Sequence, residues 1–126
     1  IRAWYKNCRL TKCFLFDMQR DIAEKNDVVM DGRDIGTVVL PDAKIKIYLT
    51  ASAEARADRR FKELTEKGQK VEYDVILKEI KERDYQDMNR EIAPLKQADD
   101  AVLVDTTELT LPQSIEYMLK VIKERL

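Results

Sequence analysis

The sequence Val28-Val29-Met30-Asp31-Gly32-Arg33-Asp34-Ile35-Gly36-Thr37 joins a short apolar run to a charged segment that contains two glycines. Apolar residues on consecutive positions are typical of a parallel strand buried on both faces, so we expect a strand over residues 28–30. In open α/β sheets, ligands bind beyond the carboxyl ends of the strands. The segment from Asp31 to Thr37 is therefore a candidate binding loop, in which Arg33 contacts an anion and Asp31 faces a hydrated Mg²⁺. A charged turn that binds nothing explains the same residues equally well.

Strands and helices alternate along the rest of the chain. Apolar periodicity predicts further strands over residues 45–49 and 101–104, and helices from Phe14 onward, over 53–67, and from Asp74 to about Ile92. Ser52 is expected to cap the second of these helices, and Asp74 to cap the third. This alternation predicts an α/β fold with a parallel sheet flanked by helices.

A last helix is predicted at the carboxyl end of the chain. Thr110 and Gln113 have the spacing of a capping box, and Pro112 is tolerated in a first helical turn. The apolar residues that follow share one helical face, which we expect to point inward: Ile115, Met118, Leu119, Ile122 and Leu126.

Composition excludes several classes of protein. The 126 residues allow one domain, and the chain contains no histidine, which excludes histidine-dependent triads and histidine-ligated zinc. Cys8 and Cys13 are the only cysteines, and we interpret both as reduced thiols in a cytoplasmic protein. No apolar run reaches the roughly 18 residues that span a membrane. The net charge of −1 gives no general basic surface for nucleic acid, so any anion must be held by a local arginine cluster.

The helix from Asp74 carries the most informative face. Its positions 76, 80, 83, 87 and 90 follow helical spacing, and they change from isoleucine to a charged set, Arg83, Asp87 and Arg90. Two arginines beside an aspartate can bind a phosphate while the carboxylate accepts a hydroxyl hydrogen bond. A solvated ion-pair face, to which Glu79, Lys81, Glu82 and Asp84 also contribute, is the alternative.

A second arginine cluster, Arg56, Arg59 and Arg60, lies early in the helix that follows Ser52. Arg56 and Arg60 share a face and could close over triphosphate oxygens. The alternative is a solvated face on which these arginines pair with Glu63.

Together these residues resemble the carboxyl-terminal part of a bacterial cytidylate kinase, or (d)CMP kinase. The resemblance covers residues 14–126, and its most specific motifs are Val29-Met30-Asp31-Gly32-Arg33-Asp34-Ile35-Gly36-Thr37-Val38-Val39, Pro41-Asp42-Ala43, Glu79-Ile80-Lys81-Glu82-Arg83-Asp84, Asp87-Met88-Asn89-Arg90 and Ala93-Pro94-Leu95. It implies an incomplete P-loop nucleoside monophosphate kinase fold, with a lid region at about residues 52–92. The implied reaction transfers the γ-phosphate of ATP to CMP or dCMP, with Mg²⁺, in a cytoplasmic monomer that binds neither nucleic acid nor membrane.

The resemblance also implies roles for individual residues. Arg33 and Arg90 would hold the CMP phosphate, Arg83 and Asp87 would orient the nucleotide, and Asp34 would recognise the cytosine amino group. Asp31 occupies the place of the strand-end acid near the metal, so Asp31 and Arg33 are the candidate catalytic residues. The ATP lid would be formed by Arg56, Arg59 and Arg60.

Two features depart from the family pattern. No Gly-x-x-x-x-Gly-Lys-[Ser/Thr] motif, the Walker A loop, occurs in the chain, and residues 1–13 form an atypical amino-terminal segment. We therefore expect this chain alone to be inactive. A monophosphate kinase with another base preference and a non-catalytic remnant that depends on a partner remain as alternatives.

Overall fold

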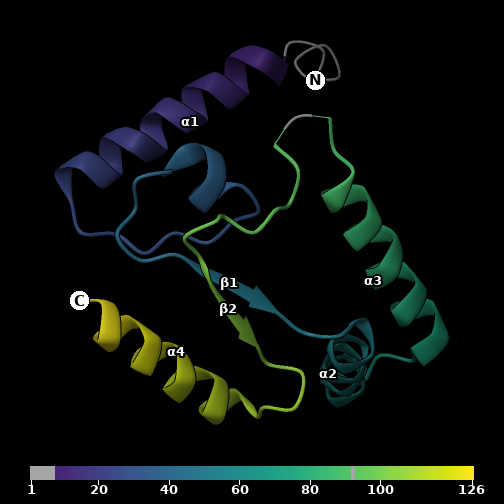
Figure 1. Cartoon of the computed structure of the whole chain (residues 1–126). Coiled ribbons are helices and arrows are strands. Elements are labelled where there is room, and N and C mark those ends of the chain that lie inside the picture. The colour runs from purple at the N-terminus through teal and green to yellow at the C-terminus, as the bar shows by residue number, and fades with distance from the viewer. Residues whose placement is uncertain (1–7, 92) are drawn as a thin grey trace.

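The computed structural model describes residues 8–91 and 93–126, and it shows a small mixed α/β arrangement (Figure 1). Five helical segments and two strands follow one another in the described part of the chain: α1 (Cys8–Lys25), the short π-helix η2 (Ile35–Val39), β1 (Ile47–Thr50), α2 (Ala53–Glu66), α3 (Tyr73–Met88), β2 (Val102–Asp105) and α4 (Leu111–Arg125). None of the helices described is long and apolar enough to cross a membrane.

The sheet consists of β1 and β2, which are parallel. Ile47 is paired with Val102 and Thr50 with Asp105. The two helices between the strands, α2 and α3, form the long connection that a parallel pair requires. The α/β class, the parallel sheet and the strands expected over 45–49 and 101–104 are therefore confirmed, each strand beginning and ending one or two residues later than predicted.

The strand expected over residues 28–30 is wrong. These residues form no strand, and the side chains of Val28 and Val29 are 37% and 102% exposed. A consecutive apolar run is stable as a strand only when neighbouring strands and both faces cover it. In the described part of the chain, β1 pairs only with β2, so residues 28–30 have no neighbouring strand to form backbone hydrogen bonds with.

Local capping chemistry fixes the beginnings of two helices. The Ser52 Oγ accepts a hydrogen bond from the Ala55 amide at 3.1 Å, which confirms the expected cap of α2. Thr110 and Gln113 form both bonds of the capping box at the start of α4. Gly68 lies beyond the end of α2 with a φ of 76°, a left-handed conformation that glycine adopts without strain.

Other helix limits differ from the expectation. The helix α3 begins at Tyr73, so its N-cap is Glu72 and the expected cap Asp74 lies inside the first turn. It ends at Met88, before the expected end near Ile92, and residue 92 itself lies outside the described residues. The first helix already begins at Cys8, six positions before Phe14.

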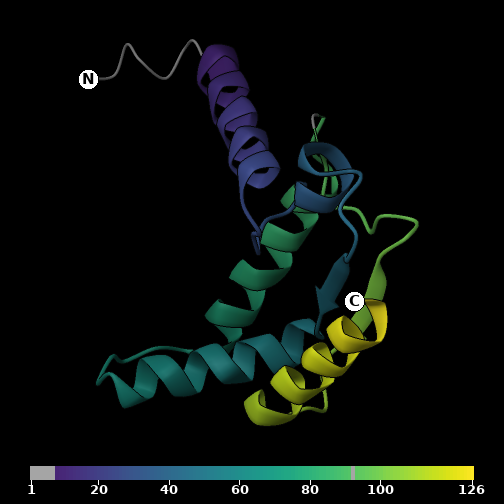
Figure 2. The ribbon, with the colours of Figure 1, turned by 90° about the vertical axis from the view of Figure 1, so that its left-hand side faces the viewer.

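The α2 and α3 helices pack on each other as a hairpin. Ala57 of α2 and Ile76 of α3 are buried, and the rings of Phe61 and Tyr73 meet edge to face with 6.2 Å between their centroids. Figure 2 shows α3 running from α2 toward η2. The hairpin thereby brings the charged end of α3 close to the loop that follows residue 30.

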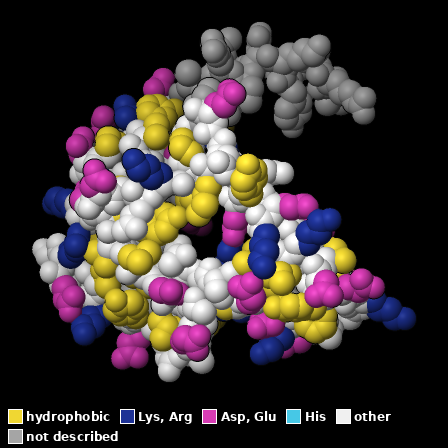
Figure 3. Space-filling view, turned by 45° about the vertical axis from the view of Figure 1, so that its right-hand side comes forward, with side chains coloured by type: hydrophobic (Ala, Val, Ile, Leu, Met, Phe, Trp, Pro, Cys, Tyr) yellow, Lys and Arg dark blue, Asp and Glu magenta, His cyan; other side chains and the backbone are white. Residues whose placement is uncertain are grey.

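The hydrophobic core is small. The chain exposes 10637 Å², whereas a folded monomer of 14.8 kDa is expected to expose about 7,000 Å². Large hydrophobic side chains such as Phe14 and Met18 of α1 are open to solvent. Figure 3 shows hydrophobic side chains forming a band across one face of the molecule. The chain on its own therefore leaves open apolar surface that a protein of this mass normally buries.

The face expected to point inward from α4 is also partly wrong. Ile115, Leu119 and Leu126 are exposed, and Met118 and Ile122 are half-buried. The buried residues of the helix are Ser114 and Val121. Because the sheet has two strands, it covers only a narrow strip of α4.

The most buried residue of the sheet gives a stability prediction. Val104 is fully buried, and changing it to alanine removes two methyl groups and leaves a cavity. We expect the free energy of unfolding to fall by about 2 kcal/mol, measured by urea unfolding of the 126-residue chain. Leu103→Ala, at a neighbouring position that is 50% exposed, is the control and should cost less than half as much. Equal losses would show that Val104 is not part of a packed core.

Candidate functional site

The loop that follows residue 30 is held by bonds from distant parts of the chain. Within the π-helical turn, the Asp34 carbonyl accepts hydrogen bonds from the amides of Val38 and Val39 at 2.9 and 3.1 Å. From α1, the Arg20 guanidinium donates to the carbonyls of Val38 and Val39. A Cβ on Gly32 would lie 2.7 Å from Ile35 Cγ1, so a larger residue there would force the Ile35 side chain or the backbone to shift. The loop carrying Asp31 and Arg33 is thus anchored at its distal end.

Lys46, the residue before β1, packs against the same loop. Its side chain is buried, bonds to the Pro41 carbonyl and pairs with Asp100 at 2.8 Å, while its methylene groups pass under Gly36. The alternating pattern of residues 44–49 suggests only that Lys46 is on the polar side of a strand. Its buried role was therefore missed, and no local signal could have revealed a partner 54 positions away.

Asp87 gathers two arginines at the end of α3. Its carboxylate is 9% exposed and binds Arg33 Nε at 2.5 Å and Arg90 Nη2 at 2.7 Å. Arg90 lies just beyond the last helical residue, and the Asp87 carbonyl accepts a bond from the Leu95 amide. The structure thus brings together three residues predicted from the sequence, although 54 positions separate Arg33 from Asp87.

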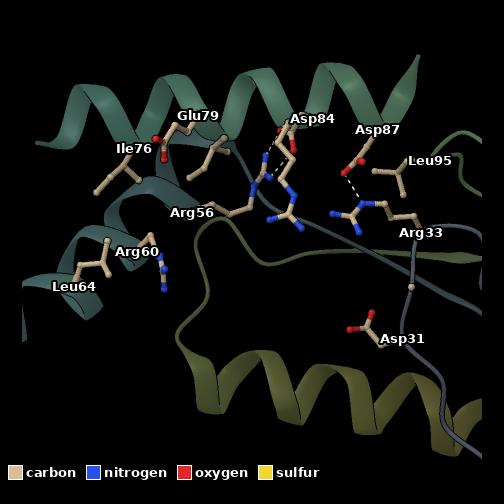
Figure 4. A pocket seen from close by; sticks show the side chains of 13 residues that line it. Asp31, Arg33, Arg56, Arg60, Leu64, Ile76, Glu79, Asp84, Asp87 and Leu95 are labelled. Atoms are coloured by element: carbon tan, nitrogen blue, oxygen red, sulfur yellow. Dashed lines mark hydrogen bonds and ion pairs between the residues drawn. The ribbon is translucent and has the colours of Figure 1, made fainter. Parts of the chain in front are cut away.

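A cavity of about 860 Å³ opens between this cluster and the α2–α3 hairpin (Figure 4). We call it the arginine cavity. The predicted site residues that line it are Asp31, Arg33, Arg56, Arg60, Arg83 and Asp87. A shallower hollow beside it is lined by Arg33, Arg83, Asp87 and Arg90, which also places Arg90 at this site. Asp34 and Arg59 do not line either hollow.

The three arginines of α2 have different surroundings. Arg56 lines the cavity and makes a two-pronged ion pair with Asp84, at 2.8 Å from Nη1 and 2.5 Å from Nη2. Arg60 also lines the cavity. It pairs with Glu63 at 2.9 Å, which is the pairing that the alternative interpretation, a solvated helix face, predicted. Arg59 instead bonds to the carbonyls of Thr106 and Leu109, which ties α2 to the end of β2.

Charges inside the arginine cavity are nearly balanced. Asp31, Glu79, Asp84 and Asp87 face four arginines, of which Arg83 has no ion-pair partner among the described residues. Hydrogen bonding from Arg56, partly opposed by burial, lowers the pKa of the Asp84 carboxyl, and the same bond raises the pKa of Arg56. Both groups are therefore charged at neutral pH. Arg83 is the open cation of the cavity, and the other arginines are held in place by carboxylates.

Asp84 is the site residue that sequence reasoning missed. The sequence placed it only in the alternative interpretation, a solvated ion-pair face that also contains Glu79, Lys81 and Glu82. The structure brings it to the arginine cavity, opposite Arg56 of a different helix. Its spacing of three residues from Asp87 is the signal that could have identified it, since such residues share a helical face.

Comparison with known proteins gives the family. A family profile described as cytidylate kinase matches residues 6–124, beginning upstream of Phe14, where the resemblance was expected to start. The cytidylate kinase of Thermosipho melanesiensis is 56% identical over 112 residues, which are 89% of this chain and 52% of that protein. The cytidylate kinase of Clostridium tetani is 52% identical over 119 residues, covering 94% of this chain and 53% of the relative. The chain spans about half the length of the curated relatives it matches. The profile match over most of the chain and the identity to these relatives place the chain in the cytidylate kinase family.

Proposed function

We propose that this chain supplies the acceptor site and the lid of a cytidylate kinase, which transfers the γ-phosphate of ATP to CMP or dCMP and forms CDP or dCDP. The observation that carries the proposal is the buried Asp87, which holds Arg33 and Arg90 beside the open guanidinium of Arg83. Phosphoryl transfer requires mainly positioning and neutralisation of charge, which arginine forks provide without a histidine base.

The acceptor phosphate would be bound by Arg33 and Arg90. Asp87 fixes both side chains before the nucleotide arrives, so less freedom is lost on binding. Arg83 lines the arginine cavity and the adjacent hollow, and with Asp87 it would orient the sugar and phosphate. This assigns Arg33, Arg83 and Arg90 to the acceptor nucleotide and leaves Arg56 and Arg60 of the same cavity for the donor.

The donor side of the proposal involves Arg56, Arg60 and Asp31. Arg56 and Arg60 line the arginine cavity and would contact ATP phosphates as part of the lid, whereas the contacts of Arg59 suit a structural anchor of α2. The described residues contain no group of three Cys, Asp or Glu side chains that could hold a metal together. Mg²⁺ is compatible with this, since it keeps its waters and uses one or two carboxylates plus phosphates. Asp31, exposed at the cavity, would hold hydrated Mg²⁺, which when bound neutralises phosphate charge.

The proposal is tested with a complete enzyme that carries these residues. We would join the chain to the portion of the Thermosipho melanesiensis kinase that it does not span, and assay the hybrid with CMP, dCMP, UMP and AMP. Preference for CMP and dCMP is the expected result. Equal activity on UMP or AMP would support the alternative of a monophosphate kinase with another base preference.

Base choice gives a sharper prediction at Asp34. Position 4 of the base is a hydrogen-bond donor in cytosine and an acceptor in uracil, so a carboxylate favours CMP and repels UMP. We expect Asp34→Ala in the hybrid to lower the ratio of kcat/KM for CMP to that for UMP by about tenfold or more. Asp42→Ala, which removes an exposed carboxylate from the same loop, is the control and should leave the ratio unchanged. An unchanged ratio in the Asp34 variant would reject this role.

A further inference from the structure

We infer that Asp84 is a positioning residue for the proposed phosphoryl transfer, because it holds the Arg56 guanidinium in the arginine cavity toward the phosphates of ATP. The inference rests on the proposed function. It adds a residue that lies outside the acceptor cluster, on the α3 wall of the cavity opposite Arg56.

The geometry of the pair is that of a rigid clamp. Both oxygens of Asp84 bind the two terminal nitrogens of Arg56, and Arg56 Nε donates to the Ala51 carbonyl at 3.1 Å. These bonds fix the plane of the guanidinium from both ends. They use three of its five N–H donors, so two are free to bind an anion. The side chains of Arg56 and Asp84 are 38% and 31% exposed, which leaves the group accessible from the cavity.

The same helix clamps a second arginine in a similar way. Asp87, one helical turn from Asp84, holds Arg33 of the 31–39 loop. Figure 4 shows the two carboxylates on α3, with Arg56 and Arg33 directed toward them. Helix α3 therefore places one arginine from the lid and one from the acceptor loop along a single cavity. The spacing between these two arginines is set by two neighbouring aspartates.

A purely structural cross-link between α2 and α3 would not require this pair. The hairpin already buries Ala57 of α2 and Ile76 of α3, and it has a second ion pair, Lys81 with Glu54 at 3.0 Å. That second pair is well exposed and does not line the arginine cavity. It offers a matched control, since breaking it removes an α2–α3 ion pair without touching the cavity.

The kinetic test uses the hybrid enzyme described above. Asp84→Asn removes the charge while it preserves the size of the side chain, so Arg56 recovers rotational freedom that nucleotide binding must again remove. We expect the KM for MgATP to rise about tenfold, with the KM for CMP and the melting temperature nearly unchanged. Lys81→Gln should change neither KM, and Asp84→Glu, which keeps a carboxylate, should recover most of the affinity.

Two kinetic results would overturn the inference. Equal effects of Asp84→Asn and Lys81→Gln would show that the pair only joins the helices. A fall in the KM for MgATP would show that Asp84 competes with the phosphates for Arg56 rather than positioning it.

A second measurement tests the clamp without relying on activity. In the ¹⁵N-labelled 126-residue chain, the Arg56 Nε–H should give a proton signal protected from exchange with water, because it is bonded to Ala51 and fixed by Asp84. Asp84→Asn should remove this protection and Lys81→Gln should preserve it. Protection that survives in Asp84→Asn would contradict the clamp. A hybrid with no CMP-dependent turnover would instead contradict the proposed function, so the two failures are distinguishable.

Discussion

The purified 126-residue chain should show no CMP-dependent consumption of ATP above background. P-loop enzymes hold the β- and γ-phosphates with backbone N–H groups and a lysine, and they use a Ser/Thr hydroxyl for Mg²⁺. None of Gly32, Gly36 and Gly68 is followed by lysine, so the chain contains no such loop. The arginines of the cavity would then still bind the acceptor nucleotide and contact ATP from the lid. No group in the chain would align the β- and γ-phosphates of ATP for transfer. Proximity alone can contribute about 7–11 kcal/mol, so its loss removes many orders of magnitude in rate.

The measurement is a coupled assay of CDP formation with the chain alone and with the Thermosipho melanesiensis hybrid. Joining the missing portion in cis should restore turnover. A second hybrid, in which the Walker A lysine implied for that portion is changed to alanine, is the control and should stay near background. Ordinary kinase turnover from the chain alone would contradict the prediction, and it would mean that another device binds the donor.

The open apolar surface is consistent with the same expectation. Val29 is fully exposed although its sequence context is that of a buried strand, and Leu49 of β1 is 56% exposed. A hydrophobic pattern predicts that a residue is buried in the complete fold. It does not predict whether the segments that would cover that residue are present in this chain. This explains why the 28–30 strand and the inward face of α4 were predicted from sound patterns and are nevertheless open here.

Local chemistry was the most predictable part of the structure. The Ser52 cap and the capping box of Thr110 depend on residues at most three positions apart, and both are present as expected. The charged face of α3 could be predicted because helical geometry alone aligns Arg83 and Asp87. The bond between Asp87 and Arg33 could not be predicted from periodicity, because the two residues are 54 positions apart. Only the family resemblance or the structure brings them together.

Roles that depend on a tertiary partner were not predictable from the pattern. Arg56 and Arg59 lie in the same cluster, yet one meets Asp84 in the arginine cavity and the other meets the carbonyls after β2. Residues three positions apart lie close together on the surface of a helix, so the helical spacing does not distinguish Arg56 from Arg59. The packing of α2 against β2 decides which neighbour each arginine meets. The burial of Lys46 has the same origin, because its partner Asp100 comes from the segment preceding β2.

In the hybrid enzyme, Arg33→Ala and Arg90→Ala should each lower kcat/KM for CMP by roughly 10- to 150-fold, the equivalent of losing about 1.5–3 kcal/mol of charge-assisted hydrogen bonding. Arg33 should show the larger loss, since it is the more buried of the two and lines both hollows of the site. Its removal also leaves the buried carboxylate of Asp87 with Arg90 as its only ion-pair partner among the described residues.

Arg125→Ala, which removes an exposed arginine far along the chain, is the control and should retain full activity. Steady-state kinetics on CMP decides the point: a change of less than about threefold in both variants would exclude the pair from the phosphate site. A loss confined to Arg90 would mean that the Arg33–Asp87 bond organises the loop without contacting the nucleotide.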